Sequence, residues 1–385
     1  MNKLNNSKGS AILVALALIL LVSGISIVTL DSSTTDMDLS YYELHEQQAF
    51  YLADAGAKRA FATTNQDSSW RSGWKDVSFG EGHYSVALRD STADPALDDT
   101  VIVLSTALVD GTRSTVELTL IPDIFNPFAY AMFAENFLDI KTFFVTDSYN
   151  SDSGNYASTQ VFDGGDLGSN GTISVNNLAQ IGGDVSTSLL GGADVDLGAT
   201  IAGTISDTAP EQDLPPIPDE EFTWAESVNA AETGMTGDYS YDVSTNAFRA
   251  DGEVELTSGV YYFSDVILDN SASLKLASGA NVTIYVAGNT EVKNSAAINA
   301  GGDPADCTIY SKGDIFLKNS GDIAATFYAP EGTVDLGNSG EFYGSIVAYD
   351  VICRNSANFH YDRKLAEIER KGFNNYNLVA WAEIL

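Results

Sequence analysis

The chain has 385 residues, with 19 Lys and Arg against 53 Asp and Glu, which gives a formal net charge of −34. This length predicts two or three domains with ample core. The charge argues against a nucleic-acid partner, because phosphate contacts need clustered basic side chains. Two Cys residues are too few for a disulfide framework.

The first feature along the chain is an uncharged apolar run from Ser10 to Leu30. At about 1.5 Å per residue, about 20 such residues cross a hydrocarbon core of about 30 Å, so the run predicts a membrane-spanning helix. Lys3 and Lys8 precede it and acidic residues follow it, which predicts a cytoplasmic N-terminus and an external body. A helical stripe then continues to about residue 62: Leu39, Tyr42, Ala49, Ala53, Gly56 and Ala60.

Three features of this region together resemble the N-terminus of PilX-type minor pilins. They are the leader (MNKLNNSKG), the apolar helix that starts directly after the Gly of the leader, and residues 48–57 (QAFYLADAGA). The resemblance implies that a prepilin peptidase cuts after Gly9, and that Ser10 becomes the mature, N-methylated terminus. It also implies that the helix, residues 10–62, packs among other pilin subunits in a filament. Most major pilins carry Glu at the fifth mature position, where this chain has Val14, and this departure favours a minor or initiating role. The alternative is a plain single-pass anchor.

Residues 63–121 are predicted to form a small antiparallel sheet like that of a pilin body. Alternating apolar and polar residues occur at 83–88, 100–105 and 114–120. The Asp-Gly pair at 110–111 joins the last two runs and is a strong hairpin signal. Pro122 and Pro127 indicate a boundary after this sheet.

The rest of the chain, residues 122–385, contains a repeat. Five similar triplets have apolar residues at the even offsets on both sides of their first residue in nearly every copy. That first residue is Asn270, Asn294, Asn319, Asn338 or Asn355. Since every second side chain of a strand lies on one face, each copy supplies one inward rung, and a second column of strands follows at 283–285, 308–310, 326–328 and 345–347. The pattern predicts a parallel β-helix with stacked Asn corners.

Two segments interrupt or end this repeat. A Pro-rich stretch with a short helix, near 207–250, is predicted to be an insertion that crosses the stack. The apolar segment Tyr376–Leu385 is predicted to cap the open end of the solenoid. The predicted fold class is therefore mainly β: a long N-terminal transmembrane helix, a small antiparallel sheet, and a parallel β-helix.

Residues 130–370 resemble the polymer-forming, bactofilin-like type of β-helical surface domain. The resemblance is carried by three runs in the same order as in that family: SYNSDSG at 148–154, GSNGTISV at 168–175 and HYDRKL at 360–365. It implies a β-helix that is attached to a pilin-like N-terminus and displayed at the bacterial surface.

Catalytic and metal-binding signals are weak. Lys293, Lys318 and Arg354 each precede a corner Asn, which predicts a solvated row rather than a cationic catalytic cluster. The three His residues lie far apart in sequence and show no zinc spacing. We expect no cofactor; calcium stays open at the Gly/Asp turns 163–166 and 182–184, although turn formation explains those residues. We expect no enzymatic activity, and no catalytic residue is assigned.

The sequence therefore predicts an acidic, non-enzymatic minor pilin-like component of a type IV pilus-like system. It would first be a single-pass protein of the inner, cytoplasmic membrane and then be pilus-associated and extracellular. Its expected partners are other pilin-like subunits and the prepilin peptidase. The alternatives are a surface adhesin or glycan-binding protein that uses the β-helix face, and, with less support, a polysaccharide-active enzyme.

Overall fold

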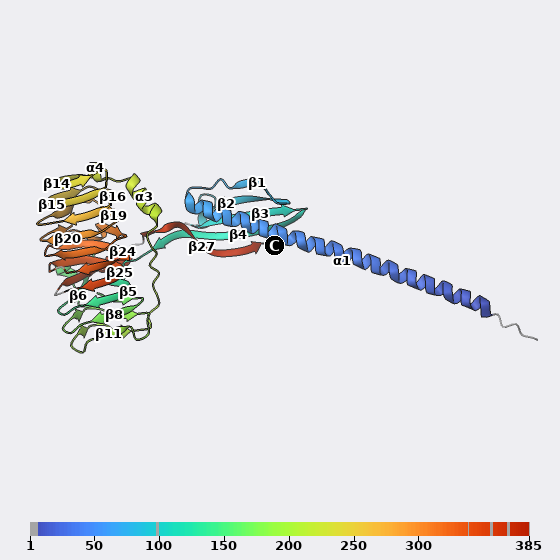
Figure 1. Cartoon of the computed structure of the whole chain (residues 1–385), viewed down its shortest axis with the longest axis horizontal. Helices are drawn as coiled ribbons and strands as arrows, with labels where there is room; N and C mark the ends of the chain where they lie inside the picture. Colours follow the sequence, from blue (N-terminus) through green and yellow to red (C-terminus); the bar gives the residue numbers. More distant parts are fainter. Residues whose placement is uncertain (1–6, 98–99, 338, 355–356, 368–369, 385) are drawn as a thin grey trace, which may run out of the picture. The chain divides into compact units, whose positions relative to one another are not determined.

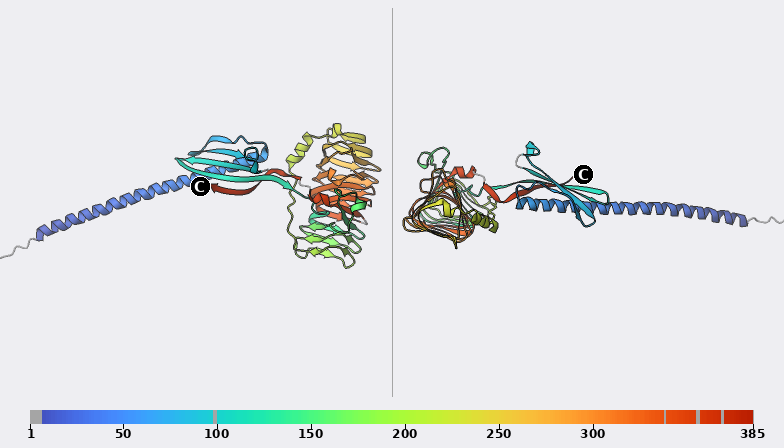
Figure 2. Two further views of the ribbon diagram at one scale, coloured as in Figure 1. Left: turned by 180° about the vertical axis from the view of Figure 1, so that it is seen from behind. Right: turned by 90° about the horizontal axis from the view of Figure 1, so that it is seen from above.

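The chain forms two units, here called the helix–sheet unit (Met1–Asp123 with Asn374–Leu385) and the solenoid unit (Ile124–Phe373). The computed structural model describes residues 7–97, 100–337, 339–354, 357–367 and 370–384. Figures 1 and 2 show both units.

The helix–sheet unit consists of helix α1 (Ser7–Gln66) packed on one face of a five-stranded sheet (Figure 1). The strands lie in the order β1-β2-β3-β4-β27. Their bounds are β1 (Trp74–Phe79), β2 (Gly82–Arg89), β3 (Val101–Val109), β4 (Thr112–Phe125) and β27 (Arg370–Ile384), with a 3-10 turn η1 (Pro95–Leu97) before β3. The predicted Asp-Gly hairpin is confirmed, because Val109 pairs with Thr112 across Asp110 and Gly111, both at positive φ.

Small side chains let α1 approach this sheet closely. Ala49, Ala53 and Ala60 are fully buried, and a Cβ on Gly56 would lie 2.4 Å from Ser105 Oγ. The predicted helical stripe is therefore confirmed over this part of α1. Leu39 and Tyr42, its first two members, are 57% and 58% exposed, because they precede the turns of α1 that pack on the sheet.

The structure corrects the predicted role of the C-terminal segment. Tyr376–Leu385 was expected to cap the solenoid, whereas its described residues belong to β27, which is hydrogen-bonded to β4. The Tyr376 backbone N–H donates to Asn65 Oδ1 at 2.7 Å, and Trp381 Nε1 donates to Asp54 at 3.1 Å. The apolar pattern of this segment is thus that of a sheet strand; sequence pattern alone does not say which sheet a strand joins.

The solenoid unit is a parallel β-helix, which confirms the predicted fold class. Its first strands are β5 (Met132–Ile140), β6 (Val145–Tyr149), β7 (Leu167–Ser169), β8 (Thr172–Val175), β9 (Gln180–Ile181), β10 (Val185–Thr187), β11 (Ala193–Val195), β12 (Thr200–Ile201) and β13 (Ile205–Ser206), with the short helix α2 (Tyr156–Thr159) after β6. Two short helices, α3 (Asp219–Ser227) and α4 (Ala231–Gly234), separate these strands from the second series.

The second series of strands contains the repeat found in the sequence. It comprises β14 (Met235–Asp242), β15 (Ala247–Leu256), β16 (Gly259–Phe263), β17 (Asp265–Leu268), β18 (Ser273–Leu276), β19 (Val282–Val286), β20 (Thr290–Asn294), β21 (Ala297–Ile298), η2 (Pro304–Asp306), β22 (Cys307–Ser311), β23 (Ile315–Asn319), β24 (Ile323–Leu336), β25 (Glu341–Cys353), β26 (Asn358–Asp362) and η3 (Arg363–Glu367). All of these strands run parallel to their neighbours except β14, which pairs antiparallel with β15.

The register inferred from the repeat is confirmed residue by residue. Leu268 pairs with Val292, Val292 with Leu317, and Leu317 with Leu336. The second column also stacks as expected, since Ile284 pairs with Ile309 and Ile309 with Phe327. The inward side chains of successive coils therefore lie above one another.

The order of coils in space differs from their order in sequence. The strand β25 pairs in parallel with β5, and β26 with β6, so the last coil of the second series stacks on the first coil of the first series. In Figure 1, β11 lies at one end of the stack and β14 at the other, with β5 and β25 between them. The insertion predicted near 207–250 is shorter than expected, because β14 and the start of β15 belong to the coil stack. The segment 207–218 joins the two series across the stack, and Tyr328 Oη donates to the Pro215 carbonyl at 2.7 Å.

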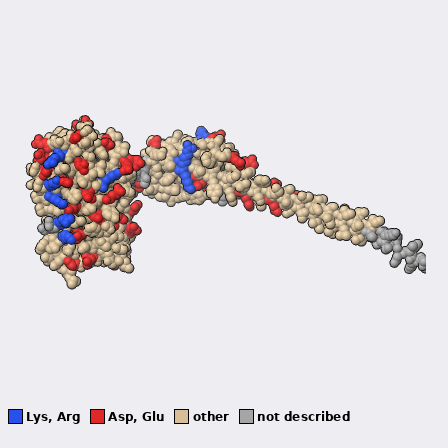
Figure 3. All heavy atoms as spheres, in the orientation of Figure 1, with Lys and Arg blue, Asp and Glu red and all other residues tan. Residues whose placement is uncertain are grey.

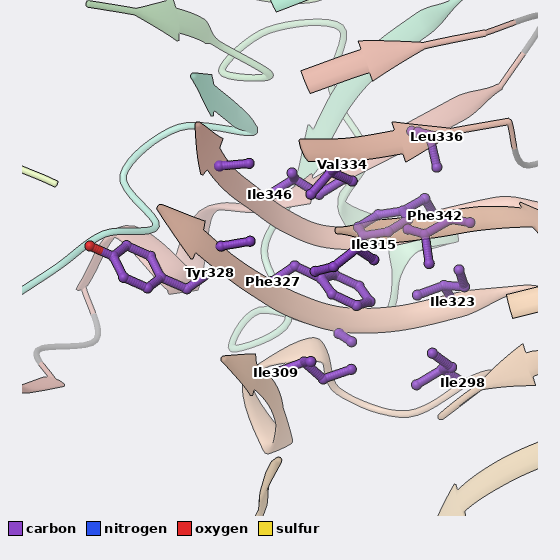
Figure 4. Close-up of a cluster of buried hydrophobic side chains, with 14 of the residues drawn as sticks. Ile298, Ile309, Ile315, Ile323, Phe327, Tyr328, Val334, Leu336, Phe342 and Ile346 are labelled. Carbon is purple, nitrogen blue, oxygen red and sulfur yellow. The ribbon is translucent and has the colours of Figure 1, made fainter. Parts of the chain in front are cut away.

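The solenoid core is a set of stacked apolar columns. Figure 4 shows Ile298, Ile323 and Phe342 from successive coils above one another. Phe342 also stacks on Phe359, with ring centroids 4.4 Å apart, and both side chains are fully buried. Because each coil is covered by the next, the columns exclude water along the stack, and stability accumulates from interfaces between neighbouring coils.

Polar side chains at the corners bond along the stack, but in a different way from the predicted Asn ladder. Asn294 and Asn319 are register partners. Asn319 Nδ2 donates to the Ala296 carbonyl at 2.7 Å, and Asn294 Nδ2 donates to Asp269 at 2.7 Å. These amides thus bond to the preceding coil rather than to each other. Asn338 and Asn355 lie outside the described residues.

Candidate functional site

Among the described residues of the helix–sheet unit, the N-terminal part of α1 is an exposed apolar surface without a packing partner. Every large apolar side chain from Ile12 to Leu30 is at least half exposed, and Val14 is 59% exposed. Within the part of the chain that the structure describes, α1 is the one helix long and apolar enough to cross a membrane. Such a surface is unfavourable in water, at about 25 cal/mol for each Å² of apolar area, and suits a hydrocarbon or protein environment.

The predicted processing residues lie at the start of this helix. Gly9 and Ser10 fall in the first turn of α1, which begins at Ser7. Their side chains are outside the described set, so cleavage after Gly9 and methylation of Ser10 stay predictions.

A cluster around His360 is the most unusual polar feature of the solenoid unit, and sequence reasoning missed it. His360 on β26 is 5% exposed. Its Nδ1 lies 2.7 Å from Asp147 Oδ1 on β6, and its Nε2 lies 2.6 Å from Glu341 Oε2 on β25. Since both ring nitrogens face carboxylate oxygens, the doubly protonated imidazolium donates both hydrogen bonds.

Aromatic rings cover the imidazole of His360. The ring of Tyr156, from α2, lies 4.1 Å from it, and that of Tyr343 lies 4.8 Å from it, measured between centroids. Tyr156 Oη also donates to Asp147 Oδ2 at 2.7 Å. Burial lowers the pKa of His360, but the hydrogen bonds to Asp147 and Glu341 outweigh burial and raise the pKa above its usual value.

A second set of contacts fastens the segment between β6 and β7 beside this cluster. Asp362 Oδ1 accepts from the Ser151 backbone N–H at 3.1 Å, and Lys364 Nζ lies 3.2 Å from both Asp152 and Asp303. Asp362 is fully buried, and burial raises the pKa of its carboxyl group. The cluster therefore joins the first coil of the first series to the last coil of the second series at one place.

Two sequence runs singled out for a family resemblance meet at this place. Residues 148–154 and 360–365 are far apart in sequence but adjacent in the structure, because β6 pairs with β26. His360 pairs in register with Asp147. Neither run contains a catalytic spacing, so only the pairing of the two coil series reveals the cluster.

The basic residues at the corners are engaged in ion pairs. Lys318 Nζ lies 3.3 Å from Asp335, and Arg354 Nε lies 2.6 Å from another oxygen of the same carboxylate. Lys293 pairs with Glu291. Figure 3 shows Lys and Arg along one face of the solenoid unit, interspersed with Asp and Glu. This arrangement is a neutralised, solvated row of the kind that the sequence predicted.

The cysteines and the glycine-rich turns have structural contacts. Cys307 and Cys353 are buried and not bonded to each other, and burial raises the pKa of the Cys307 thiol to about 12. In the turns considered for calcium, Asp166 Oδ1 accepts from the Asp184 backbone N–H at 2.7 Å. Among the described residues, no group of three or more His, Cys, Asp or Glu side chains is placed to hold a metal ion.

Comparison with known proteins adds one family match over part of the chain. A family model described as "Domain of unknown function (DUF7305)" matches residues 206–323 and 264–368, which lie mainly in the second series of coils. No curated protein matches the chain. The solved structure of the competence-associated pilin ComZ from Thermus thermophilus is similar at 13% sequence identity, over 88% of this chain and 97% of that chain, with a TM-score of 0.29. A TM-score this low does not establish a shared fold.

Proposed function

We propose that this protein is a non-enzymatic minor pilin-like component of a type IV pilus-like system. In this proposal a prepilin peptidase cleaves the chain after Gly9, Ser10 is methylated, and α1 anchors the protein in the inner membrane before it joins a filament. The acidic solenoid is then displayed outside the membrane.

The observation that carries the proposal is the division of α1 into two parts. Residues 12–30 are apolar, uncharged and exposed, whereas the last turns pack on an antiparallel sheet through Ala49, Ala53 and Ala60. A helix built in this way serves two environments: its first part requires lipid or other apolar helices, and its second part holds a folded body close to them. The basic leader before the helix favours a cytoplasmic N-terminus.

The polar groups of the solenoid unit support the non-enzymatic part of the proposal. Asp147 and Glu341 are both bonded to His360, beneath Tyr156. The carboxylate Asp335 is likewise held between Lys318 and Arg354. Carboxylates that are neutralised by protein cations are poorly suited to general acid–base work, which needs one group free to bind the substrate. These contacts instead stabilise the coil stack.

The mature N-terminus tests the proposal. The full chain would be expressed in cells with an active prepilin peptidase, and intact mass and peptide mapping would identify its first residue. We expect a chain that starts at a methylated Ser10. The matched variant Gly9→Val should keep the leader, because a bulky side chain replaces the residue next to the scissile bond. Retention of Met1 by the unsubstituted chain would refute the pilin-like assignment.

A further inference from the structure

The strand β27 forms one edge of the sheet in the helix–sheet unit, and apolar side chains on both of its faces are partly exposed. It has one neighbour, β4, among the described strands. Leu378, Val379, Trp381 and Ile384 are 43–52% exposed. From Tyr376 to Ile384 the strand contains one charged residue, Glu383, and neither Pro nor Gly.

The opposite edge of the same sheet is protected against pairing. The strand β1 has six residues, carries exposed Lys75 and Asp76, and is interrupted by an irregularity in its register between Trp74 and Val77. Short length, charge and bulges are the usual means by which a sheet edge avoids another strand. The edge at β27 is 15 residues long and, from Tyr376 to Ile384, carries Glu383 as its one charged residue. A long, mainly apolar edge of this kind is a surface for strand addition.

We propose that the free edge of β27 binds an extended segment of another protein, which adds to the sheet as a sixth strand. Main-chain hydrogen bonds along Tyr376–Ile384 would hold the segment. The exposed Leu378 and Val379, which lie on opposite faces of the strand, would contact side chains on the two faces of the segment. Because the whole chain carries a net charge of −34, the segment is uncharged or basic.

The direction of α1 argues for another protein rather than a second copy. Antiparallel pairing of β27 with its own copy uses a two-fold axis perpendicular to the sheet. That axis reverses every direction in the sheet plane, including that of α1, which lies along one sheet face (Figures 1 and 2). Two copies anchored by α1 in one membrane must have their α1 helices pointing the same way, so they cannot be related by this axis. This step rests on the proposed function.

Photo-crosslinking in the native assembly tests the inference. The full chain, expressed in cells that assemble filaments, would carry a photoreactive amino acid at Val379 or, as a matched control on the other edge, at Phe79, which is 68% exposed. We expect an adduct with a different polypeptide from position 379 and none from position 79. The added substitution Leu378→Lys should lower the adduct yield about tenfold, which corresponds to about 1.4 kcal/mol.

A measurement on the unsubstituted chain guards against misfolded variants. Amide hydrogen exchange of β27 should be slower in assembled filaments than in the detergent-solubilised protein, whereas that of β1 should be similar in both. Equal exchange of β27 in both states, adducts only with a second copy, or equal adducts from both positions would overturn the inference. Sequencing the N-terminus of the chains in the same samples distinguishes failure of the two proposals. Chains that start at Ser10 but form no adduct would refute strand addition at β27 and leave the pilin-like role standing. Chains that keep Met1 but form an adduct would refute the pilin-like role and leave strand addition standing.

Discussion

The His360 cluster leads to a specific prediction about pH and stability. The substitution His360→Gln removes the positive charge that lies between Asp147 and Glu341, and leaves Asp147, whose side chain is 14% exposed, without its cation. Breaking a buried ion pair by removing one partner costs about 3–5 kcal/mol. The Glu341 side chain is 39% exposed, so solvent screening limits that bond to about 1 kcal/mol or less, and Gln can still donate one hydrogen bond. We expect a loss of about 3 kcal/mol.

The pH dependence follows from the direction of the pKa shift. The pKa of His360 is raised in the folded state, so its contribution to stability is complete below the unfolded value of about 6.5. That contribution is lost as the pH rises through the folded-state pKa. The unsubstituted protein should therefore lose stability as the pH rises above about 6.5, and the stability of the His360→Gln variant should change little over the same rise in pH.

Native-state hydrogen exchange of β6 and β26 measures this locally and does not require the whole chain to unfold in one step. The matched control is His83→Gln, because His83 is 46% exposed and lies 3.6 Å from Asp76, which is itself 80% exposed. The control should leave exchange in β6 and β26 unchanged. If the unsubstituted protein and the His360→Gln variant showed the same pH dependence, the imidazolium would not hold the two coil series together.

Three further predictions concern packing and burial. Gly56→Ala should lower the melting temperature of the helix–sheet unit, since a Cβ at position 56 would lie 2.4 Å from Ser105 Oγ. The control Gly24→Ala, where a Cβ would have nothing within 4 Å, should stabilise the helix by about 1 kcal/mol. Equal melting temperatures of the two variants would contradict the close approach of α1 to the sheet. Phe342→Ala should cost the solenoid unit about 3–5 kcal/mol in urea titrations, and Tyr349→Ala, at a 43% exposed site, much less. Cys307 should react with iodoacetamide only after denaturation, because it is buried with a raised pKa; rapid labelling of the native protein would refute this.

Much of the local structure was predictable because it follows from short-range pattern. An uncharged run long enough to span a membrane predicted α1, and the Asp-Gly pair predicted the turn between β3 and β4. The solenoid register was predictable for a similar reason: side chains alternate along a strand, so the even offsets from each Asn identify the inward face. The structure confirms that Val266, Thr290, Ile315 and Val334 form one such column.

The strand β1 was missed because its pattern is too weak to predict. It is six residues long, exposed at most positions, and carries two adjacent charged residues. The strand β4 also runs on through Pro122 to Phe125, while the division between the two units falls directly after Asp123. Pro has no N–H donor and a restricted φ, so a strand can continue through it where that donor is not needed.

The sequence by itself determined the helix, the hairpin and the rungs of the solenoid, since each depends on residues close together along the chain. Tertiary structure alone decided that β27 joins β4, that β5 stacks on β25, and that His360 meets Asp147. These pairings join residues that are more than 200 positions apart. The pattern of a strand predicts which of its faces is apolar, but not which sheet edge the strand will pair with. The partner strand is selected only in the folded chain, because the packing of the whole unit excludes the other possible strand pairings.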